Sequence, residues 1–475
     1  MVAHTSDKAP LGYLWRSSKL FIVAAVSMAM FSDSFLFSYI IPIFPALLHD
    51  RLQIPDSRAQ FVISAVLSMN ALVSIPLAPV TGYLSDRISS KNDVMIGSYI
   101  INLVGTAITA WSPTVTGVII GRLIQAISGS MIWITGMAIL GNSVGVENLS
   151  KAFGLCVLFV SAGHLSGPAL AGVLYDSIPY SIMWLPTFLV LAVGLIMQAL
   201  LIEPSTTPRK SETGLGADLY PSESDEEAES LLPPGPVIPQ VHHYHSIGDF
   251  PDPPPRQPAS SWYIYWSMLS KRRVTNALIA DVLFAILIGS FEATIPMHVR
   301  EVFHWESLGA GMSFLLLQAP SLVLVIPAGW LKDRYGMRMP VTIGFILMAP
   351  SLWLLGVPGN SNFGWADGEK AGQTIYILTL VVIGACRTSL LGFGGVEVLN
   401  GANELAAEQP GIFGSGTGYS RASAMSNISW KLGLFLGPLL SGLLTGSIGY
   451  YMMNIVLAIL CFIMGVTTYL AYWRA

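Results

Sequence analysis

The sequence predicts an all-α membrane protein of about twelve transmembrane helices, arranged as two pseudo-symmetric bundles of six. Three observations predict this fold class: an apolar composition, hydrophobic runs of spanning length, and motifs that recur in the same order in both halves. Hydrophobic residues make up 53% of the chain, charged residues 11%, and the mean hydropathy is +0.60. Soluble domains carry about twice that share of charge, so lipid must cover much of the surface.

Composition also excludes several kinds of protein. The formal net charge of -4 argues against a nucleic-acid partner, because a phosphate-binding face needs a basic excess. Cys156, Cys386 and Cys461 each lie inside an apolar run, so we expect no disulfide framework, metal site or cofactor. The sequence has no Gly-x-x-x-x-Gly-Lys-Ser/Thr loop that would bind ATP phosphates, and no histidine–carboxylate cluster at ligand spacing inside the helices. We therefore do not expect an ATP-driven pump or an enzyme.

The hydrophobic runs divide into two sets, each run long enough to cross a bilayer with about 20 residues. The first set lies near 20–46, 60–83, 94–111, 114–140, 151–175 and 182–202. The second set lies near 274–299, 308–331, 339–357, 374–399, 422–446 and 449–472. The first run is too long for a signal peptide and has no small-residue cleavage site, so we interpret it as the first transmembrane helix.

A segment of different character separates the two sets. Residues 203–273 contain PSESDEEAES and two proline clusters, and they cannot bury enough apolar surface to fold alone. The predicted organisation is an N-terminal half (1–202), a disordered cytoplasmic linker (203–273) and a C-terminal half (274–475). Basic residues give the orientation, because they gather in cytoplasmic loops. The outward loops hold only Arg51, Arg58, Arg300 and Lys370, so we expect both termini in the cytoplasm.

Two motifs recur at matching helices of the two halves. Gly82, Asp86 and Arg87 follow the second helix, and Gly329, Asp333 and Arg334 follow the eighth at the same spacing. Gly163, Gly167, Pro168 and Gly172 in the fifth helix match Gly433, Gly437, Pro438 and Gly442 in the eleventh. Duplicated halves around a site at the membrane midplane are typical of secondary transporters.

The motif after the second helix, GYLSDRISSK, resembles the loop signature of the major facilitator superfamily, and GWLKDRYGMR is a closer copy. The resemblance covers nearly the whole chain outside the linker and tails. Aspartates there can accept hydrogen bonds at a helix N-terminus, and arginines can pair across the halves. The resemblance therefore implies a cytoplasmic gate at these residues; the alternative is that they simply mark a cytoplasmic turn.

Two further motifs resemble signatures of proton-coupled members. GRLIQAISGS places Arg122 inside the fourth helix, where a charge is costly and usually functional. GHLSGPALAG resembles the fifth-helix signature of drug:proton antiporters. Its glycines allow another helix to approach closely, and Pro168 removes a backbone hydrogen bond. We therefore predict hinges in the fifth and eleventh helices, at Gly163, Gly167, Pro168, Gly172, Gly437 and Pro438. Antiport is implied here by the resemblance alone.

One acidic residue lies deep inside the first helix of each half. Asp33 and Glu292 are ionisable at membrane depth, and such a carboxyl can take up and release a proton near physiological pH. The alternatives are a structural partner for a buried cation, or a misplaced helix boundary. Asp281, nearer the end of the same helix as Glu292, is expected at the membrane interface.

The first and seventh helices look most like vesicular amine transporters and their fungal relatives. By motif spacing, the acidic tenth-helix position of those transporters falls on Arg387, and their charged second- and eleventh-helix positions fall on Asn70 and Asn427. These departures put monoamine transport in doubt and make a weakly anionic or neutral solute at least as plausible. Glu397 and Lys431, near the inner ends of the tenth and eleventh helices, could pair with each other, and we assign them a structural role rather than one in transport.

The sequence thus predicts a secondary active transporter that exports or sequesters a small organic solute by proton antiport and alternating access. Its predicted partners are the bilayer, the solute and protons, and we expect it to work as a monomer. The plasma membrane is the expected location, with a vacuolar or vesicular membrane as the alternative. A transport-inactive receptor or scaffold of the same fold is the competing interpretation, and the retained Asp33, Arg122 and Glu292 favour transport.

Overall fold

The computed structural model describes residues 12–87, 90–144, 146–202, 261–366, 369–413 and 419–471. The described part of the chain is helical, and eleven stretches of it are long and apolar enough to cross a membrane. The last of these stretches, Arg421–Ala471, holds two helices joined across a kink at Gly449, whose φ of 85° is left-handed. Counting that stretch as two crossings gives the predicted all-α fold with about twelve spans.

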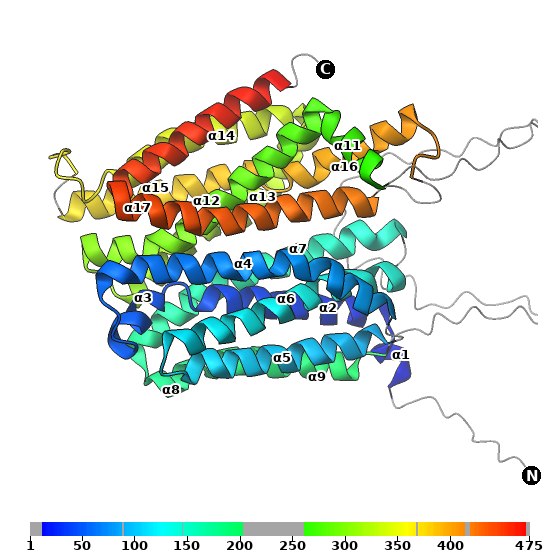
Figure 1. Cartoon of the computed structure of the whole chain (residues 1–475), viewed down its shortest axis with the longest axis horizontal. Coiled ribbons are helices and arrows are strands. Elements are labelled where there is room, and N and C mark those ends of the chain that lie inside the picture. The colour runs from blue at the N-terminus through cyan, green and yellow to red at the C-terminus, as the bar shows by residue number, and fades with distance from the viewer. Residues whose placement is uncertain are drawn as a thin grey trace, which may run out of the picture.

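The helices before the linker belong to one group. They are α1 (Tyr13–Arg16), α2 (Lys19–Tyr39), α3 (Phe44–Ala46), a π-helical turn (Leu47–Arg51), α4 (Asp56–Arg87), α5 (Lys91–Trp111), α6 (Val115–Ser143), α7 (Val146–Ser177), α8 (Tyr180–Met183) and α9 (Leu185–Leu200). The helices after it are α11 (Ser261–Ser270), α12 (Arg272–Phe303), α13 (Ser307–Tyr335), α14 (Arg338–Gly356), α15 (Glu369–Leu390), α16 (Phe393–Glu408) and α17 (Tyr419–Ala471). Figure 1 shows these two groups stacked along their length.

Side-chain caps fix where several of the helices begin. The hydroxyl oxygens of Ser18, Ser90 and Thr114 accept hydrogen bonds from the backbone N–H groups of Phe21, Asp93 and Gly117, at 3.2–3.3 Å. Such bonds satisfy N–H groups that have no partner within the helix, and each is worth about 1 kcal/mol. These caps begin α2, α5 and α6, three of the helices that form the N-terminal group.

Close packing inside each group follows the repeated glycine motif. A methyl group at Gly163 of α7 would lie 2.8 Å from the carbonyl oxygen of Phe31 in α2, and one at Gly437 of α17 would lie 2.5 Å from that of Ile286 in α12. Ser38 donates to the Gly163 carbonyl, and Ser290 donates to the Gly437 carbonyl, both at 3.3 Å. The first helix of each group is therefore held to its fifth by the same kind of contact.

The structure places a helix at the end of the segment that the sequence assigned to the linker. Residues 203–260, including the acidic and proline-rich stretches, lie outside the described residues, but Ser261–Ser270 form α11 and Arg272 begins α12. Within α11, the Ser270 hydroxyl bonds to the Ser267 carbonyl at 2.8 Å. The division of the chain into halves and linker is otherwise still a prediction.

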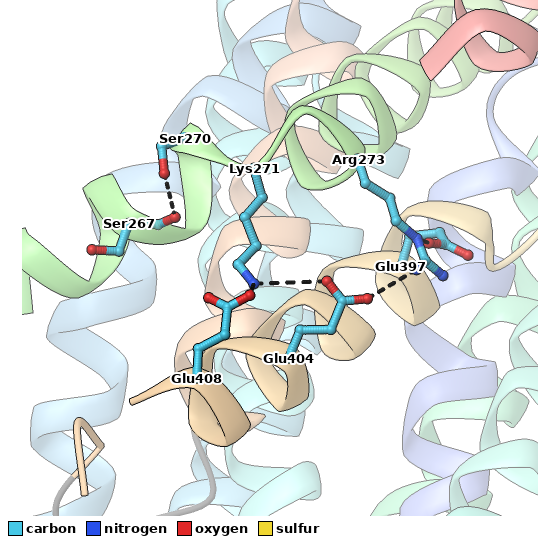
Figure 2. A network of polar contacts seen from close by, with 7 residues as sticks. All are labelled: Ser267, Ser270, Lys271, Arg273, Glu397, Glu404 and Glu408. Carbon is cyan, nitrogen blue, oxygen red and sulfur yellow. Dashed lines mark hydrogen bonds and ion pairs between the residues drawn. The ribbon is translucent and has the colours of Figure 1, made fainter. Parts of the chain in front are cut away.

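An ion-pair network ties the start of α12 to α16, as Figure 2 shows. Lys271 contacts Glu408 at 2.8 Å and Glu404 at 3.7 Å, and Arg273 contacts Glu404 at 2.9 Å and also pairs with Glu397. The predicted pairing of Glu397 with Lys431 is therefore wrong. Arg273 reaches Glu397 because both lie at the end of the molecule where α12 begins, whereas Lys431 lies three turns further into the bundle.

The two ends of the molecule differ in how the groups meet. We call the end that carries α1, α11 and α16 the linker end, and the end that carries α3 and α8 the far end (Figure 1). Ile202, just after α9, donates its backbone N–H to the carbonyl of Arg16 at 3.2 Å, so the first and sixth spans begin and end on the same side. In a chain that spans the membrane, this arrangement follows from an even number of crossings per half.

Two hydrogen bonds join the groups toward the far end. The Gln60 side chain of α4 donates to the carbonyl of Ala293 in α12 at 3.0 Å, and the Leu308 backbone N–H of α13 donates to Asp176 of α7 at 2.8 Å. The glycines also approach there, because a methyl at Gly311 would lie 2.5 Å from the Pro168 carbonyl oxygen. The far end is therefore closed.

The linker end is open along α13. Residues 323–327 are five consecutive exposed positions, which is more than one helical turn, so the N-terminal group buries no face of α13 at that depth, although Ser321 and Lys332 on either side contact α15. Toward the far end, the same helix buries Ala310, Phe314 and Leu317. The groups therefore touch at the far end and separate toward the linker end.

Candidate functional site

Asp33 lies on α2 against α6, where the sequence leaves room for its carboxyl group. A methyl at Gly129 of α6 would lie 3.0 Å from the Asp33 carboxyl carbon, so only a glycine allows this approach. Trp133, one turn further along α6, is a hydrogen-bonding neighbour of the same carboxyl group. The charged groups close enough to act on Asp33 are Lys431 and then Arg122.

Arg122 is 2% exposed on α6 and is anchored to α2. Its guanidinium donates to the Phe37 carbonyl at 3.3 Å and to the Gln125 side chain at 3.0 Å, and it lies 5.2 Å from the Phe37 ring centre. Gln125 in turn donates to Thr106 of α5 at 2.9 Å. The arginine thus points into the bundle, and its charge acts on Asp33 and on Glu292 across the groups.

Glu292 and Arg387 supply the C-terminal half of the site. Glu292 is 7% exposed on α12, and Arg387 is 9% exposed on α15. Of the carboxylates Asp33 and Glu292, Glu292 is the one whose charge acts on Arg387. Among the described residues no direct ion pair joins them, so they interact at a distance.

Two residues of this site escaped the sequence interpretation. Lys431 of α17 was assigned a structural role, but its charge acts on Asp33 across the two groups. His164 of α7 donates through Nδ1 to the Val160 carbonyl oxygen at 3.1 Å, and Arg387 and Lys431 are the cations whose charges act on its ring. His164 is the second residue of the GHLSGPALAG motif, and its position on the inward face one residue after Gly163 was the available signal.

We call Asp33, Arg122, His164, Glu292, Arg387 and Lys431 the central charge cluster. Its members come from α2, α6, α7, α12, α15 and α17, three helices of each group. Each lies well inside its helix or, for Arg387, in the last turn before a break. An arrangement that gathers ionisable groups from both halves at membrane depth is able to bind a polar solute and to exchange protons.

The break that follows Arg387 is a feature the sequence did not predict. Helix α15 ends at Leu390, and Gly392 begins α16 with a left-handed φ of 77°. Lys332 of α13 donates to the carbonyls of Thr388 at 3.2 Å and Leu391 at 2.7 Å, which satisfies the end of α15. Arg387 therefore lies in the last turn of a broken helix, not in the middle of a continuous one.

Asp281 is buried at the other side of this break. Its carboxyl group accepts a hydrogen bond from Ser426 of α17 at 2.8 Å, and the Gly394 backbone at the start of α16 is a further hydrogen-bonding neighbour. A carboxylate is favourable at a helix N-terminus. Asp281 is only 8% exposed and joins α12 to α16 and α17, so it is buried within the protein, and its depth in the membrane is still a prediction.

The predicted gate residues are described in one half only. Gly329 lies near the end of α13, and Asp333 and Arg334 are exposed one turn later, with the Arg334 guanidinium 5.2 Å from the Trp330 ring centre. The side chains of their counterparts Gly82, Asp86 and Arg87 lie outside the described residues. Exposure of Asp333 and Arg334 agrees with separation of the groups at the linker end.

The remaining predicted site residues occupy two different settings. Asn70 is half-buried in the middle of α4, and Asn427 is exposed on α17 near the linker end. Pro168 and Pro438 lie inside α7 and α17. Gly172 of α7 packs against Ser307 of α13, and Gly442 of α17 packs against Ser64 of α4, so each predicted hinge helix reaches the opposite group at the far end.

Comparison with known proteins agrees with this architecture. Residues 26–418 match the family described as the Major Facilitator Superfamily. The fungal "MFS-type transporter ppzB" of Metarhizium rileyi is 26% identical, with 98% of this chain and 97% of that protein covered. The "Uncharacterized MFS-type transporter C18.02" of Schizosaccharomyces pombe is also 26% identical, with 94% and 95% covered.

A solved structure shares the fold at lower identity. The bacterial homologue of the human lysosomal transporter Spinster, in an inward-facing and unoccupied conformation, superposes with a TM-score of 0.64 at 12% identity, and covers 95% of this chain and 96% of that chain. The match to the family spans most of the chain, and its members are transporters rather than enzymes. The chain is therefore a multi-pass membrane transporter that belongs to the Major Facilitator Superfamily.

Proposed function

We propose that the chain is a proton-coupled secondary active transporter that exports or sequesters a small organic solute by alternating access. The observation that carries the proposal is the pair of carboxylates in the central charge cluster, Asp33 and Glu292. Each lies on the first helix of its group, and each has cations of both groups near it. A carboxyl group whose charge is balanced by nearby cations can exchange its proton as those cations or a solute move.

The contacts between the groups support alternating access. The hydrogen bonds of Gln60 with Ala293 and of Asp176 with Leu308 close the far end, whereas α13 is uncovered toward the linker end. If the linker end faces the cytoplasm, as the basic residues predict, this is an inward-open state that loads its solute from inside. The solute would be released across the plasma membrane or into an internal compartment when the linker end, which carries Asp333 and Arg334, closes and the far end opens.

The mode of coupling depends on the charge of the solute. Antiport, which the fifth-helix motif implies, requires that the proton and the solute exclude each other at the central charge cluster. A cation does this by competing for Asp33 or Glu292, whereas an anion binds more readily when those groups are protonated. Proton coupling through the two carboxylates is common to both modes and is the core of the proposal.

The test uses the purified chain in proteoliposomes with a pH-sensitive dye in the lumen. A screen of anionic, neutral and cationic organic solutes under an imposed pH gradient identifies a solute whose uptake follows the gradient. Asp33→Asn and Glu292→Gln should each abolish gradient-driven accumulation and the lumenal pH change, yet still exchange labelled for unlabelled solute without a gradient. Asp93→Asn, an exposed carboxylate in the first turn of α5, is the matched control. Normal gradient-driven accumulation in both cluster variants would refute the proposal.

A further inference from the structure

Arg387 is a buried cation whose hydrogen-bonding capacity is unused. Its exposure is 9%, and its Nε is buried with no hydrogen-bond partner in the part of the chain that the structure describes. Its terminal nitrogens take part in none of the side-chain bonds found there, in contrast to those of Arg122, which bind Phe37 and Gln125. A guanidinium stays protonated and has five donors in a fork, and the terminal nitrogens of Arg387, unlike its Nε, are not enclosed, so a ligand that supplies acceptors can reach them.

The helix break beside Arg387 does not use those donors. Position 387 lies in the last turn of α15, where free carbonyls attract a cation. Lys332 already binds the carbonyls of Thr388 and Leu391, at 3.2 and 2.7 Å. Lys332 therefore makes the hydrogen bonds to the end of α15 that would otherwise explain a basic residue at position 387. The guanidinium of Arg387 is not needed for them and can bind a ligand.

The surroundings of Arg387 favour an anion. Arg387 and Lys431 are the cations whose charges reach His164 of α7, and Glu292 is the carboxylate whose charge acts on Arg387. Three cations (Arg122, Arg387 and Lys431) face two carboxylates (Asp33 and Glu292), so the central charge cluster carries one excess positive charge with both carboxylates ionised. Tyr99 of α5, which also faces Asp33, and His164 add no negative charge when neutral.

We propose that Arg387, together with His164 and Lys431, is the subsite that binds the carboxylate of a monoanionic organic solute. This inference rests on the proposed transport function and names its substrate class. A carboxylate accepts two parallel hydrogen bonds from a guanidinium fork, and one negative charge cancels the excess of the central charge cluster. A dianion would overcompensate the charge, and an amine would add to the excess and compete with Arg387 for Glu292.

The same charges give the sign of the coupling to protons. Protonation of Asp33 or Glu292 removes a negative charge and raises the positive excess that the solute meets, and protonation of His164 acts in the same direction. Protons and the carboxylate solute therefore promote each other's binding, because the coupling between two sites is reciprocal. For this solute class the central charge cluster favours joint movement of proton and anion over exchange, so an acidic exterior or lumen would drive a carboxylate solute toward the cytoplasm, which reverses the export direction proposed above.

Binding to the purified, full-length chain tests the subsite without any gradient. The probes are phenylacetate, phenylacetamide and 2-phenylethylamine, which share a ring and differ in charge, with phenylphosphate as a dianion. Their effect on the unfolding temperature reports binding, and so does the change in intrinsic tryptophan fluorescence that is lost when Trp133, the hydrogen-bonding neighbour of Asp33, is replaced by phenylalanine. We expect phenylacetate to bind and the amide, amine and dianion to bind more weakly by about tenfold or more.

Variants connect that preference to Arg387. Arg387→Gln should lower phenylacetate affinity by about tenfold or more, and Arg387→Lys, which keeps the charge without the fork, should lie between. Arg58→Gln is the matched control, because Arg58 is an exposed arginine of α4 outside the cluster.

Phenylacetate affinity should also rise as pH falls from about 7.5 to about 5.5, a range in which the probe stays ionised. Asp33→Asn with Glu292→Gln should bind phenylacetate tightly at both pH values.

Each outcome decides between the proposals. Equal binding of the amide and the acid, or full phenylacetate affinity in Arg387→Gln, would overturn the subsite even if gradient-driven transport is observed. Selective phenylacetate binding that is lost in Arg387→Gln would establish the subsite even if Asp33 and Glu292 proved dispensable for coupling. If Arg387→Gln does not fold, Arg387→Lys provides the test. Unchanged phenylacetate affinity and an unchanged preference for phenylacetate over the amide in Arg387→Lys would show that the guanidinium does not bind the carboxylate through two hydrogen bonds.

Discussion

Gly442 of α17 lies against Ser64 of α4, so that helices of different halves touch at the far end with no side chain between them at position 442. On the other side of the molecule Gly172 of α7 lies in the same way against Ser307 of α13. These two contacts occupy equivalent positions of the repeated motif. They make the far-end closure dependent on the absence of a side chain at two sites.

Gly442→Leu should therefore open the far end. Overpacking of a close contact costs about 1–3 kcal/mol, which shifts a two-state equilibrium by about tenfold or more. A cysteine introduced at Thr294, which is 2% exposed beside the Gln60 contact, reports the opening by its reaction with a membrane-impermeant thiol reagent. Gly446→Leu is the control, because a methyl at Gly446 meets no atom within 4 Å. Equal thiol reactivity in the two leucine variants would contradict the expected role of Gly442.

Asp176→Asn should also weaken the far-end closure. The Asp176 carboxylate accepts the Leu308 backbone N–H in the first turn of α13, and a charged group at a helix N-terminus is worth about 1 kcal/mol. We expect the same cysteine at position 294 to react about fivefold faster. Glu306→Gln, which changes the N-cap residue of α13 that makes no capping bond, should leave the rate unchanged. If the cysteine reacted faster in Glu306→Gln than in Asp176→Asn, the far-end closure would depend on negative charge near the start of α13 and not on the hydrogen bond between Asp176 and Leu308.

Gly163→Val should destabilise the N-terminal half rather than shift its conformation. A methyl at Gly163 would lie 2.8 Å from the Phe31 carbonyl oxygen and 3.0 Å from the Phe35 nitrogen, and backbone atoms cannot move aside cheaply. We expect loss of about 1–3 kcal/mol, read as a lower midpoint of thermal aggregation of the detergent-purified chain. Gly154→Val on the same helix, where a methyl meets nothing within 4 Å, should keep the parent midpoint. Matching midpoints for the two variants would show that α2 and α7 do not need this contact.

The fold could be predicted from the sequence because the lipid bilayer constrains both the length of the hydrophobic runs and the placement of charged residues. Run length and basic-residue bias are direct consequences of the bilayer thickness and of membrane insertion. The repeated glycines were also informative, since close helix approach demands them. Local breaks were harder to predict: the interruption at Gly392 depends on Lys332 and Asp281, which bind its two sides from helices distant in sequence. Helix α11, at the end of the predicted linker, was missed because its 10 residues are too few to span a membrane.

The candidate site was predicted in part for a similar reason. Asp33, Arg122, Glu292 and Arg387 are conspicuous because charges are rare in apolar runs. Lys431 was assigned to Glu397, which the structure pairs with Arg273 instead. Pairing between helices requires their depth and rotation, and spacing along one chain gives neither. His164 was missed although it lies inside the GHLSGPALAG motif, because the glycines of that motif explained the segment by helix packing alone.

Arg122→Lys should impair transport although it keeps the charge. A lysine cannot reach both the Phe37 carbonyl and the Gln125 side chain in the planar geometry of a guanidinium. Phe37 lies one turn beyond Asp33 on α2, so this anchor fixes the position of the carboxyl group relative to α6. Loss of a hydrogen bond from a charged group costs about 1.5–3 kcal/mol, and we expect gradient-driven uptake to fall by about tenfold or more. Arg58→Lys, an exposed change on α4, should transport at the parent rate, and the same rate in Arg122→Lys would show that only charge is needed at position 122.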